Sequence, residues 1–236
     1  MTIFKIRNEK REAELWIYDA IGESSLWFDG ISANDIRQEL AGMQDVDTIS
    51  VHINSEGGDV FQGIAMLNLL RDHSATVKVY VDGLAGSIAS VVAMAGDEVI
   101  MNQSSLFMIH NPWAGTAGDA DELRQLADVL DAVREEIISA YQTRVSLDRE
   151  ELRQLMNAET WLGADEAVEM GFASSASSLS VAAFSGIEPT REHWARNYKN
   201  APTAKALKTK QEKQEPKPPE KRLSSEAWCR LQRAIV

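Results

Sequence analysis

The sequence comprises 236 residues, 44% of them hydrophobic, with a formal net charge of −12. This length can bury one good core, and the absence of any run of eighteen apolar residues excludes a transmembrane helix. Residues 1–190 carry 12 Lys and Arg against 31 Asp and Glu, and this acidic body argues against a nucleic-acid-binding fold.

The two ends of the chain fit a protein of a reducing compartment. Residues 1–12 are rich in charge and lack a long apolar segment, so we expect no secretory signal. Cys229 is the single cysteine and cannot form a disulfide within the chain. Because disulfides are rare in the cytosol, we expect a cytoplasmic protein.

Short strands and helices alternate through the body of the chain. We expect strands over residues 49–53, 77–81, 98–101 and 106–109, and helices over residues 60–72 and 87–95. The second helix is small and apolar throughout, which predicts burial on all sides. Repeated strand–turn–helix units predict a layered α/β domain with parallel strands.

Residues 120–143 carry the clearest helical pattern in the sequence. Charged residues fill one side of the expected helix, which would be about 35 Å long at 1.5 Å per residue. The apolar residues of the other side recur at spacings of three or four and are Leu123, Leu126, Leu130, Val133, Ile137 and Tyr141. An apolar stripe of this kind must pack against another surface.

Two shorter helices are expected after this long one. The first begins after Ser146, which suits an N-cap, and has Asp148 in its first turn. The second covers residues 164–170, with Asp165 as its cap, and ends at Gly171, the residue type preferred after a helix.

The composition changes at residue 174 and divides the chain into a globular domain, 1–173, and a tail, 174–236. The tail opens with a polar low-complexity run over residues 174–178. Residues 200–222 are mostly Lys, Gln, Glu, Pro and Ala, so we expect them to be disordered. Residues 224–236 can form a short amphipathic helix, near the minimum length for stability in water.

The charge of the tail is opposite to that of the body. Residues 191–236 carry 12 Lys and Arg against 5 Asp and Glu. Such a basic segment is either a solvated tail or a contact for an acidic partner or nucleic acid, and the pattern leaves both open.

Three loops that follow strand-like segments carry residue types of an acyl-transfer site. Gly57 and Gly58 can bring backbone N–H groups close to a ligand, although a tight turn without a ligand has the same pattern. Ser87 begins the small apolar helix, where its hydroxyl is either an exposed nucleophile or only an N-cap. His110 follows a strand and precedes a proline turn, as a general base or as a buried core residue.

The other histidines have weaker claims to a catalytic role. His52 lies inside a strand, His73 ends a helix, and His193 lies in the tail. The sequence offers no cluster of metal ligands and no phosphate-binding loop, so we expect no metal and no cofactor.

In this order, segments 53–63, 83–90 and 108–112 resemble the proteolytic subunit of the Clp protease family, with its Asn-Ser-x-Gly-Gly loop, Gly-x-Ala-x-Ser turn and Met-Ile-His strand. Residues 161–171 resemble the closing segment of that family, and the resemblance spans roughly residues 15–173. It implies the layered ββα superhelix that the family shares with crotonases, with the long helix as a protruding handle. It also implies a ring-shaped homo-oligomer in which two rings dock through the handles and the active sites face an inner chamber.

The resemblance implies a serine endopeptidase and assigns a role to each site residue. Ser87 would be the nucleophile, His110 the general base, and Glu159 the carboxylate that orients the base. The oxyanion would lie between the backbone N–H groups of Gly58 and Ile88.

Two positions depart from the housekeeping enzymes of the family. Glu159 stands where they have aspartate, and its extra methylene requires a backbone slightly farther from His110. Glu56 stands where they have proline, which should leave the oxyanion loop less rigid.

The basic tail and the Glu-Thr-Trp sequence of residues 159–161 resemble Clp-like head maturation proteases of tailed bacteriophages and prophages. This implies capsid and scaffold proteins, and the enzyme's own tail, as substrates in the cytoplasm of a bacterial host or in the procapsid. The alternatives are a cytoplasmic Clp-type subunit that works with an ATP-dependent AAA+ unfoldase, a crotonase-like acyl-CoA enzyme, and a non-catalytic assembly or scaffold protein.

Overall fold

A computed structural model of the chain describes residues 4–7, 11–24, 30–177 and 198–201. All of them belong to one compact unit that ends at Ala201. Outside the described residues lie residues 202–222 of the expected disordered segment and the expected terminal helix over residues 224–236.

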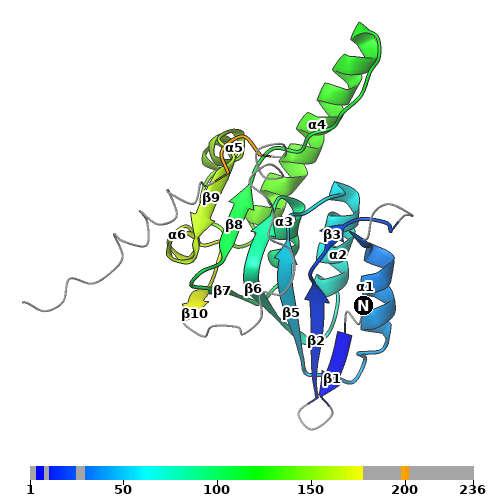
Figure 1. The fold of residues 1–236 in the computed structure, drawn as a ribbon, viewed down its shortest axis with the longest axis vertical. Coiled ribbons are helices and arrows are strands. Elements are labelled where there is room, and N and C mark those ends of the chain that lie inside the picture. The colour runs from blue at the N-terminus through cyan, green and yellow to red at the C-terminus, as the bar shows by residue number, and fades with distance from the viewer. Residues whose placement is uncertain (1–3, 8–10, 25–29, 178–197, 202–236) are drawn as a thin grey trace, which may run out of the picture. The chain divides into compact units, whose positions relative to one another are not determined.

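A mainly parallel sheet forms the centre of this unit (Figure 1). Its strands are β1 (Phe4–Arg7), β2 (Glu12–Ile17), β5 (Thr48–Ser55), β6 (Thr76–Gly86), β7 (Glu98–Asn102), β8 (Leu106–Ile109), β9 (Thr160–Gly163) and β10 (Ser175–Ser177). The order is β1-β2-β5-β6-β7-β10, and β8 pairs with the end of β6 and with β9. Among the described strands, only the pairs β1–β2 and β8–β9 are antiparallel, while β3 (Ala20–Ile21) and β4 (Gly30–Ile31) form a separate small parallel pair. The predicted layered α/β fold is confirmed.

Six helices accompany these strands in the described part of the chain. They are α1 (Ala33–Ala41), α2 (Val60–Arg71), α3 (Ile88–Ala93), α4 (Ala120–Tyr141), α5 (Arg149–Asn157) and α6 (Ala164–Glu169). Five of them were predicted from the sequence, with ends that differ by a few residues. None of the helices in the described ranges combines the length and the apolarity needed to cross a membrane.

The caps of the two short helices differ from the prediction. Helix α5 is capped by Asp148, whose carboxylate accepts the N–H of Glu151 at 2.8 Å, and not by Ser146. The N-cap of α6 is Gly163, not Asp165, and the N–H of Gly163 donates to the carboxylate of Glu166 at 2.9 Å. A cap depends on which acceptor faces the free amides of the first turn, and neighbouring polar residues cannot be told apart by type alone.

The compact unit also extends past residue 173, where the tail was predicted to begin. Strand β10 pairs in parallel with β7 at the sheet edge. Just before it, the N–H of Ser174 donates to the carbonyl oxygen of Val99 at 2.7 Å. Because this pairing uses backbone groups and small side chains, a Ser/Ala run lacks the apolar alternation that identifies a buried strand.

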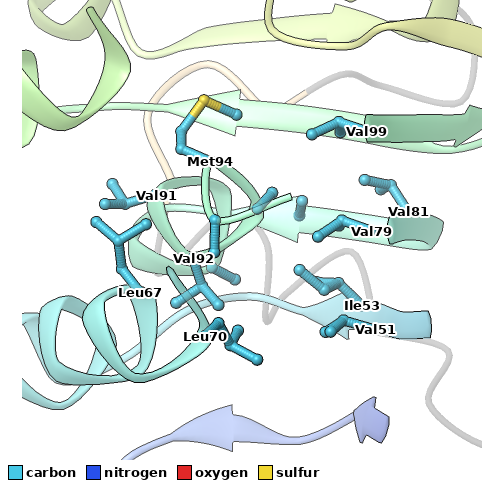
Figure 2. Close-up of a cluster of buried hydrophobic side chains, with 14 of the residues drawn as sticks. Val51, Ile53, Leu67, Leu70, Val79, Val81, Val91, Val92, Met94 and Val99 are labelled. Atoms are coloured by element: carbon cyan, nitrogen blue, oxygen red, sulfur yellow. The ribbon is translucent and has the colours of Figure 1, made fainter. Parts of the chain in front are cut away.

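The core lies between the sheet and the helices α2 and α3. Alternate residues of the central strands point to one face, as the strand period of two requires. Figure 2 shows side chains of β5, β6 and β7 opposite those of the two helices: Val51, Ile53, Val79, Val81 and Val99 on the strands, Leu67, Leu70, Val91 and Val92 on the helices, and Met94 after α3. All are buried, and each large aliphatic side chain contributes about 1.5–3 kcal/mol of burial free energy. Every residue of α3 is buried, as predicted.

Helix α4 extends beyond the sheet (Figure 1). Its last turns are anchored in the core through Ile137, Ile138 and Tyr141. Its first half carries exposed apolar side chains, with Leu123 at 45% and Val129 at 51% exposure. Within the described residues, the predicted apolar stripe is therefore fully buried only at its base.

Candidate active site

The candidate site lies at the carboxyl ends of three neighbouring parallel strands. Strand β5 leads into the glycine loop at Gly57, β6 leads into Ser87, and β8 leads into His110. In open parallel sheets this edge is where ligands bind, since the loops that follow the strands converge there.

Strand register brings the serine and the histidine together. Gly86 of β6 pairs with Met108 of β8, and the N–H of Ser87 donates to the carbonyl oxygen of Met108 at 2.9 Å. His110 lies two residues beyond Met108, and its Nε2 is 2.7 Å from Ser87 Oγ. This is a short hydrogen bond between a hydroxyl and a potential base.

The backbone of Ser87 adopts an unusual conformation, with φ 52° and ψ −126°. A non-glycine residue in such a region costs about 1–3 kcal/mol and persists only where its surroundings impose it. Here the sharp turn from β6 into α3 orients the side chain toward His110 rather than toward the helix amides, since it makes no capping hydrogen bond. Ser87 thus occupies the N-cap position of α3 without capping the helix through its side chain.

His110 lies in surroundings that favour its neutral form. Burial lowers the pKa of the imidazole, and the charge of Lys199 lowers it further, against the opposing effect of the Glu159 carboxylate. A neutral ring can accept a proton from Ser87 at neutral pH, which is the requirement for a general base.

The glycine loop packs directly against the serine turn. Gly57 has φ 98°, and a Cβ there would lie 2.7 Å from both the carbonyl oxygen of Gly86 and the Cβ of Ser87. Gly58 has φ 147°, and a Cβ there would lie 2.1 Å from the carbonyl oxygen of Ile21. Only glycine permits this close approach of two backbones.

The two predicted oxyanion donors come from these adjoining segments. A Cβ on Gly57 would lie 3.0 Å from the backbone nitrogen of Ile88, so the glycine loop and the start of α3 are in contact. Ile88 is the first residue of α3, where the N–H has no acceptor within the helix. The amides of Gly58 and Ile88 thus belong to two segments that touch at Gly57.

Glu159 is placed beside the histidine by the antiparallel pair β8–β9. Ile109 pairs with Thr160, so the residues that flank this pair are His110 and Glu159. Glu159 is 8% exposed and, like Ser87, has a positive φ, of 48°. Two of the three non-glycine residues with positive φ in the described ranges are thus predicted catalytic residues.

The hydrogen bonds of the Glu159 carboxylate differ from the expectation. Its oxygens accept the N–H of Lys199 at 2.8 Å, the N–H of Asn200 at 2.7 Å and the indole N–H of Trp161 at 3.2 Å. His110 is not among the donors that the described residues provide. Glu159 acts on the histidine here through its charge, which raises the pKa of His110 against the lowering effect of burial.

Comparison with known proteins identifies the family of this chain. A sequence profile of the Clp protease family matches residues 28–177. The chain belongs to the Clp protease family. The ATP-dependent Clp protease proteolytic subunit of Bacteroides thetaiotaomicron is 28% identical over 148 residues, which cover 61% of this chain and 67% of the relative.

Two further likenesses support the same family and fold. The ATP-dependent Clp protease proteolytic subunit of Deinococcus radiodurans is 30% identical over 125 residues, covering 52% of this chain and 61% of the relative. The solved structure of the ClpP1 N165D mutant from Listeria monocytogenes superposes with a TM-score of 0.61 at 22% identity, covering 72% of this chain and 92% of that one. The Clp family chain described here is accordingly a serine-type peptidase with the ClpP fold.

A cavity of about 310 Å³ opens beside the serine and the histidine of this Clp family chain. Its lining residues are Ala20, Glu56, Gly57, Gly58, Val60, Ser87, His110, Pro112, Trp113 and Tyr198. The last of these was not foreseen, because Tyr198 lies in the predicted tail and no periodicity or motif marks it. Its position in the cavity is established only by the contacts made in the folded chain.

The remaining histidines of the described chain are engaged elsewhere. His52 Nδ1 lies 2.8 Å from Asp82 Oδ2, and its ring stacks between those of Trp16 and Tyr80. His73 Nδ1 accepts a backbone N–H at 3.1 Å at the end of α2. His193 lies outside the described residues. The described ranges contain no group of three or more His, Cys, Asp and Glu side chains suited to a metal ion.

Proposed function

We propose that this peptidase is an endopeptidase that cleaves peptide bonds with Ser87 as nucleophile, His110 as general base and Glu159 as the acidic member of the triad. The observation that carries this proposal is the 2.7 Å hydrogen bond between Ser87 Oγ and His110 Nε2. The strained backbone of Ser87 supports it, because such strain is retained where function requires it.

The chemistry follows from the positions of the two polar side chains. As Ser87 Oγ attacks the peptide carbonyl carbon, its proton passes to His110 Nε2, a transfer that contributes about 10²–10⁴-fold to the rate. The imidazolium then gives that proton to the leaving amine, and a water activated by His110 hydrolyses the acyl-enzyme. The serine is released in its starting form.

The negative oxygen of the tetrahedral intermediate needs donors on the far side of Ser87. We propose the N–H groups of Gly58 and Ile88, and the contact of Gly57 with the serine turn supports this choice. The loss of one such donor typically costs about 3 kcal/mol of transition-state stabilisation.

The proposed role of Glu159 is to stabilise the His110 imidazolium and to hold the ring in the reactive tautomer. Its place opposite His110 across the β8–β9 pair and its influence on the pKa of that ring support this role. In the active arrangement the carboxylate would accept the Nδ1–H of His110.

We propose that the active form is a homo-oligomer, ring-shaped, with helix α4 at the contact between copies. The support is the first half of α4, where the apolar side chains of Leu123 and Val129 are about half exposed. Exposed apolar patches of this kind mark interaction sites.

The natural substrate is proposed in two forms that experiment can separate. The resemblance of residues 159–161 and of the basic tail to phage enzymes supports cleavage of capsid and scaffold proteins in head maturation. The relatives in Bacteroides and Deinococcus are named ATP-dependent, which supports instead an AAA+ unfoldase partner. Cleavage of a folded protein that requires an added unfoldase and ATP would favour the second form.

The nucleophile is tested by labelling with a fluorophosphonate probe, followed by mass spectrometry of the labelled peptide. Wild-type protein should be labelled on Ser87, and Ser87→Ala should lose labelling and about 10⁴-fold or more of its peptidase activity. Ser104→Ala changes an exposed serine and serves as the matched control, with unchanged labelling. Substantial peptidase activity in Ser87→Ala, or labelling at another residue, would contradict the assignment.

A further inference from the structure

A short segment from beyond the sheet lies against the candidate active site. It is formed by residues 198–200, which follow β10 by twenty residues along the chain. The hydroxyl of Tyr198 donates to the backbone carbonyl oxygen of Glu56 at 3.2 Å. Its ring packs edge-on against Trp161, with 5.2 Å between the ring centroids, and lies 6.2 Å from the ring of His110. Tyr198 therefore occupies one wall of the cavity that contains Ser87.

The same segment binds both oxygens of the acidic residue. The N–H of Lys199 donates to Oε2 of Glu159 at 2.8 Å, and the N–H of Asn200 donates to Oε1 at 2.7 Å. The Asn200 side-chain amide adds a hydrogen bond of 2.7 Å to the carbonyl oxygen of Ala158. Two successive amides that grip one carboxylate form a compact anion-binding nest.

These contacts oppose the arrangement that catalysis needs. Both oxygens of the Glu159 carboxylate accept backbone N–H groups, from Lys199 and Asn200. A hydrogen bond from His110 Nδ1 to this carboxylate must therefore compete with these two, which are strong because their acceptor is charged. The charge of Lys199 also lowers the pKa of His110 and so disfavours the imidazolium that forms during the attack.

We infer that residues 198–200 form an autoinhibitory strap, which holds Glu159 through two backbone amides and covers the cavity at Ser87 and His110 with Tyr198. This inference rests on the proposed function, because it concerns the regulation of the same site. A polypeptide substrate needs the wall that Tyr198 occupies, so binding and strap release are coupled. The enzyme is active only in the fraction of molecules whose strap has left the site.

The strap has two roles, the backbone hydrogen bonds to Glu159 and the Tyr198 ring in the cavity wall. Each can be changed independently in the full-length protein. Asn200→Pro removes the N–H that donates to Glu159 Oε1, and Ala201→Pro is its matched control, one residue beyond the two donors. Tyr198→Ala removes the ring from the cavity wall without restricting the backbone. Circular dichroism and melting temperature establish that each variant is folded.

The measured quantity is the rate at which a fluorophosphonate probe labels Ser87 and at which a short fluorogenic peptide is cleaved. Asn200→Pro and Tyr198→Ala should both accelerate labelling about tenfold or more, because a hydrogen bond to a charged group is lost or the cavity is opened. Ala201→Pro should label at the wild-type rate. Both rates should rise together, since the strap blocks the same site in each assay.

The alternatives give different outcomes. Rates that fall in Asn200→Pro and Tyr198→Ala would overturn the inference and make the strap a support for Glu159, and unchanged rates would overturn it as well. In both cases the proposed function would stand, because Ser87 would still be labelled. Failure of every protein, wild type included, to be labelled at Ser87 would instead overturn the proposed function, and the inference with it.

Discussion

The contact between the glycine loop and the serine turn can be tested with one added methyl group. Gly57→Ala places a Cβ 2.7 Å from the Cβ of Ser87 and 2.7 Å from the carbonyl oxygen of Gly86, where no Cβ can stay. The neighbours are backbone atoms and the first atom of a side chain, so they cannot move aside by rotation. Either the loop or the serine turn must shift.

Two contributions determine the size of the effect. Alanine at the φ of Gly57, 98°, costs about 1–3 kcal/mol in backbone strain. Relief of the close contacts costs about another 1–3 kcal/mol, as for other overpacked sites. The free energy of unfolding should therefore fall by roughly 2–6 kcal/mol, a large part of the roughly 5–15 kcal/mol typical of a domain. Displacement of Ser87 by about 1 Å should lower the labelling rate about 10²-fold.

Urea unfolding followed by circular dichroism, at one fixed protomer concentration, measures the first effect, and fluorophosphonate labelling measures the second. Gly115→Ala is the matched control, since a Cβ there meets no atom within 4 Å, and its stability should stay within about 1 kcal/mol of wild type. If Gly57→Ala unfolds at the wild-type midpoint and is labelled at the wild-type rate, the close packing of the two segments is wrong.

Three further predictions concern the acid, the base and the assembly. Glu159→Gln should cut turnover roughly 10²–10⁴-fold, because a neutral amide does not stabilise the imidazolium. Glu166→Gln keeps an oxygen that can accept the N–H at the start of α6 and should leave turnover unchanged. The reverse result would show that another residue is the acidic member of the triad. Activity needs neutral His110, whose pKa is lowered, so kcat/KM should fall with acid only below pH 6.5. Lys199→Ala removes a charge that lowers this pKa, so the fall in kcat/KM should move to higher pH. An unchanged pH profile would exclude an effect of the Lys199 charge on His110. Leu123→Glu should reduce the mass measured by light scattering at micromolar concentration, and a wild-type monomer under those conditions would exclude assembly through α4.

The sequence was sufficient to predict strands β5 to β8, five of the six described helices and the order of the three loops, but not α1 or the other strands. Periodicity predicts an element because it reflects which side chains must be buried, and the core residues of β5 and β6 follow it closely. It does not predict which strands are neighbours. The contact between Ser87 and His110 depends on the pairing of the end of β6 with β8, and the sequence alone suggested it only through a family resemblance.

Two features of the site had no sequence signal at all. The positive φ values of Ser87 and Glu159 are imposed by the surrounding fold, since neither residue type favours such a conformation. The contacts of residues 198–200 use mainly backbone amides, which every residue except proline possesses. Composition therefore assigned to the tail the very residues that bind Glu159.

In helix α4 the apolar periodicity predicted the helix correctly but did not show which surface covers its apolar stripe. Its stripe was predicted to be buried, and the chain itself buries only the end that carries Ile137, Ile138 and Tyr141. Leu123, near the other end, remains 45% exposed, and such apolar surface carries about 25 cal/mol of unrealised burial free energy per Å². A second copy of the chain offers an identical helix with an identical unmet stripe, so one two-fold contact satisfies both at once. The spacing that would mark a core helix in a monomer therefore supports, in this protruding helix, the proposed contact between subunits.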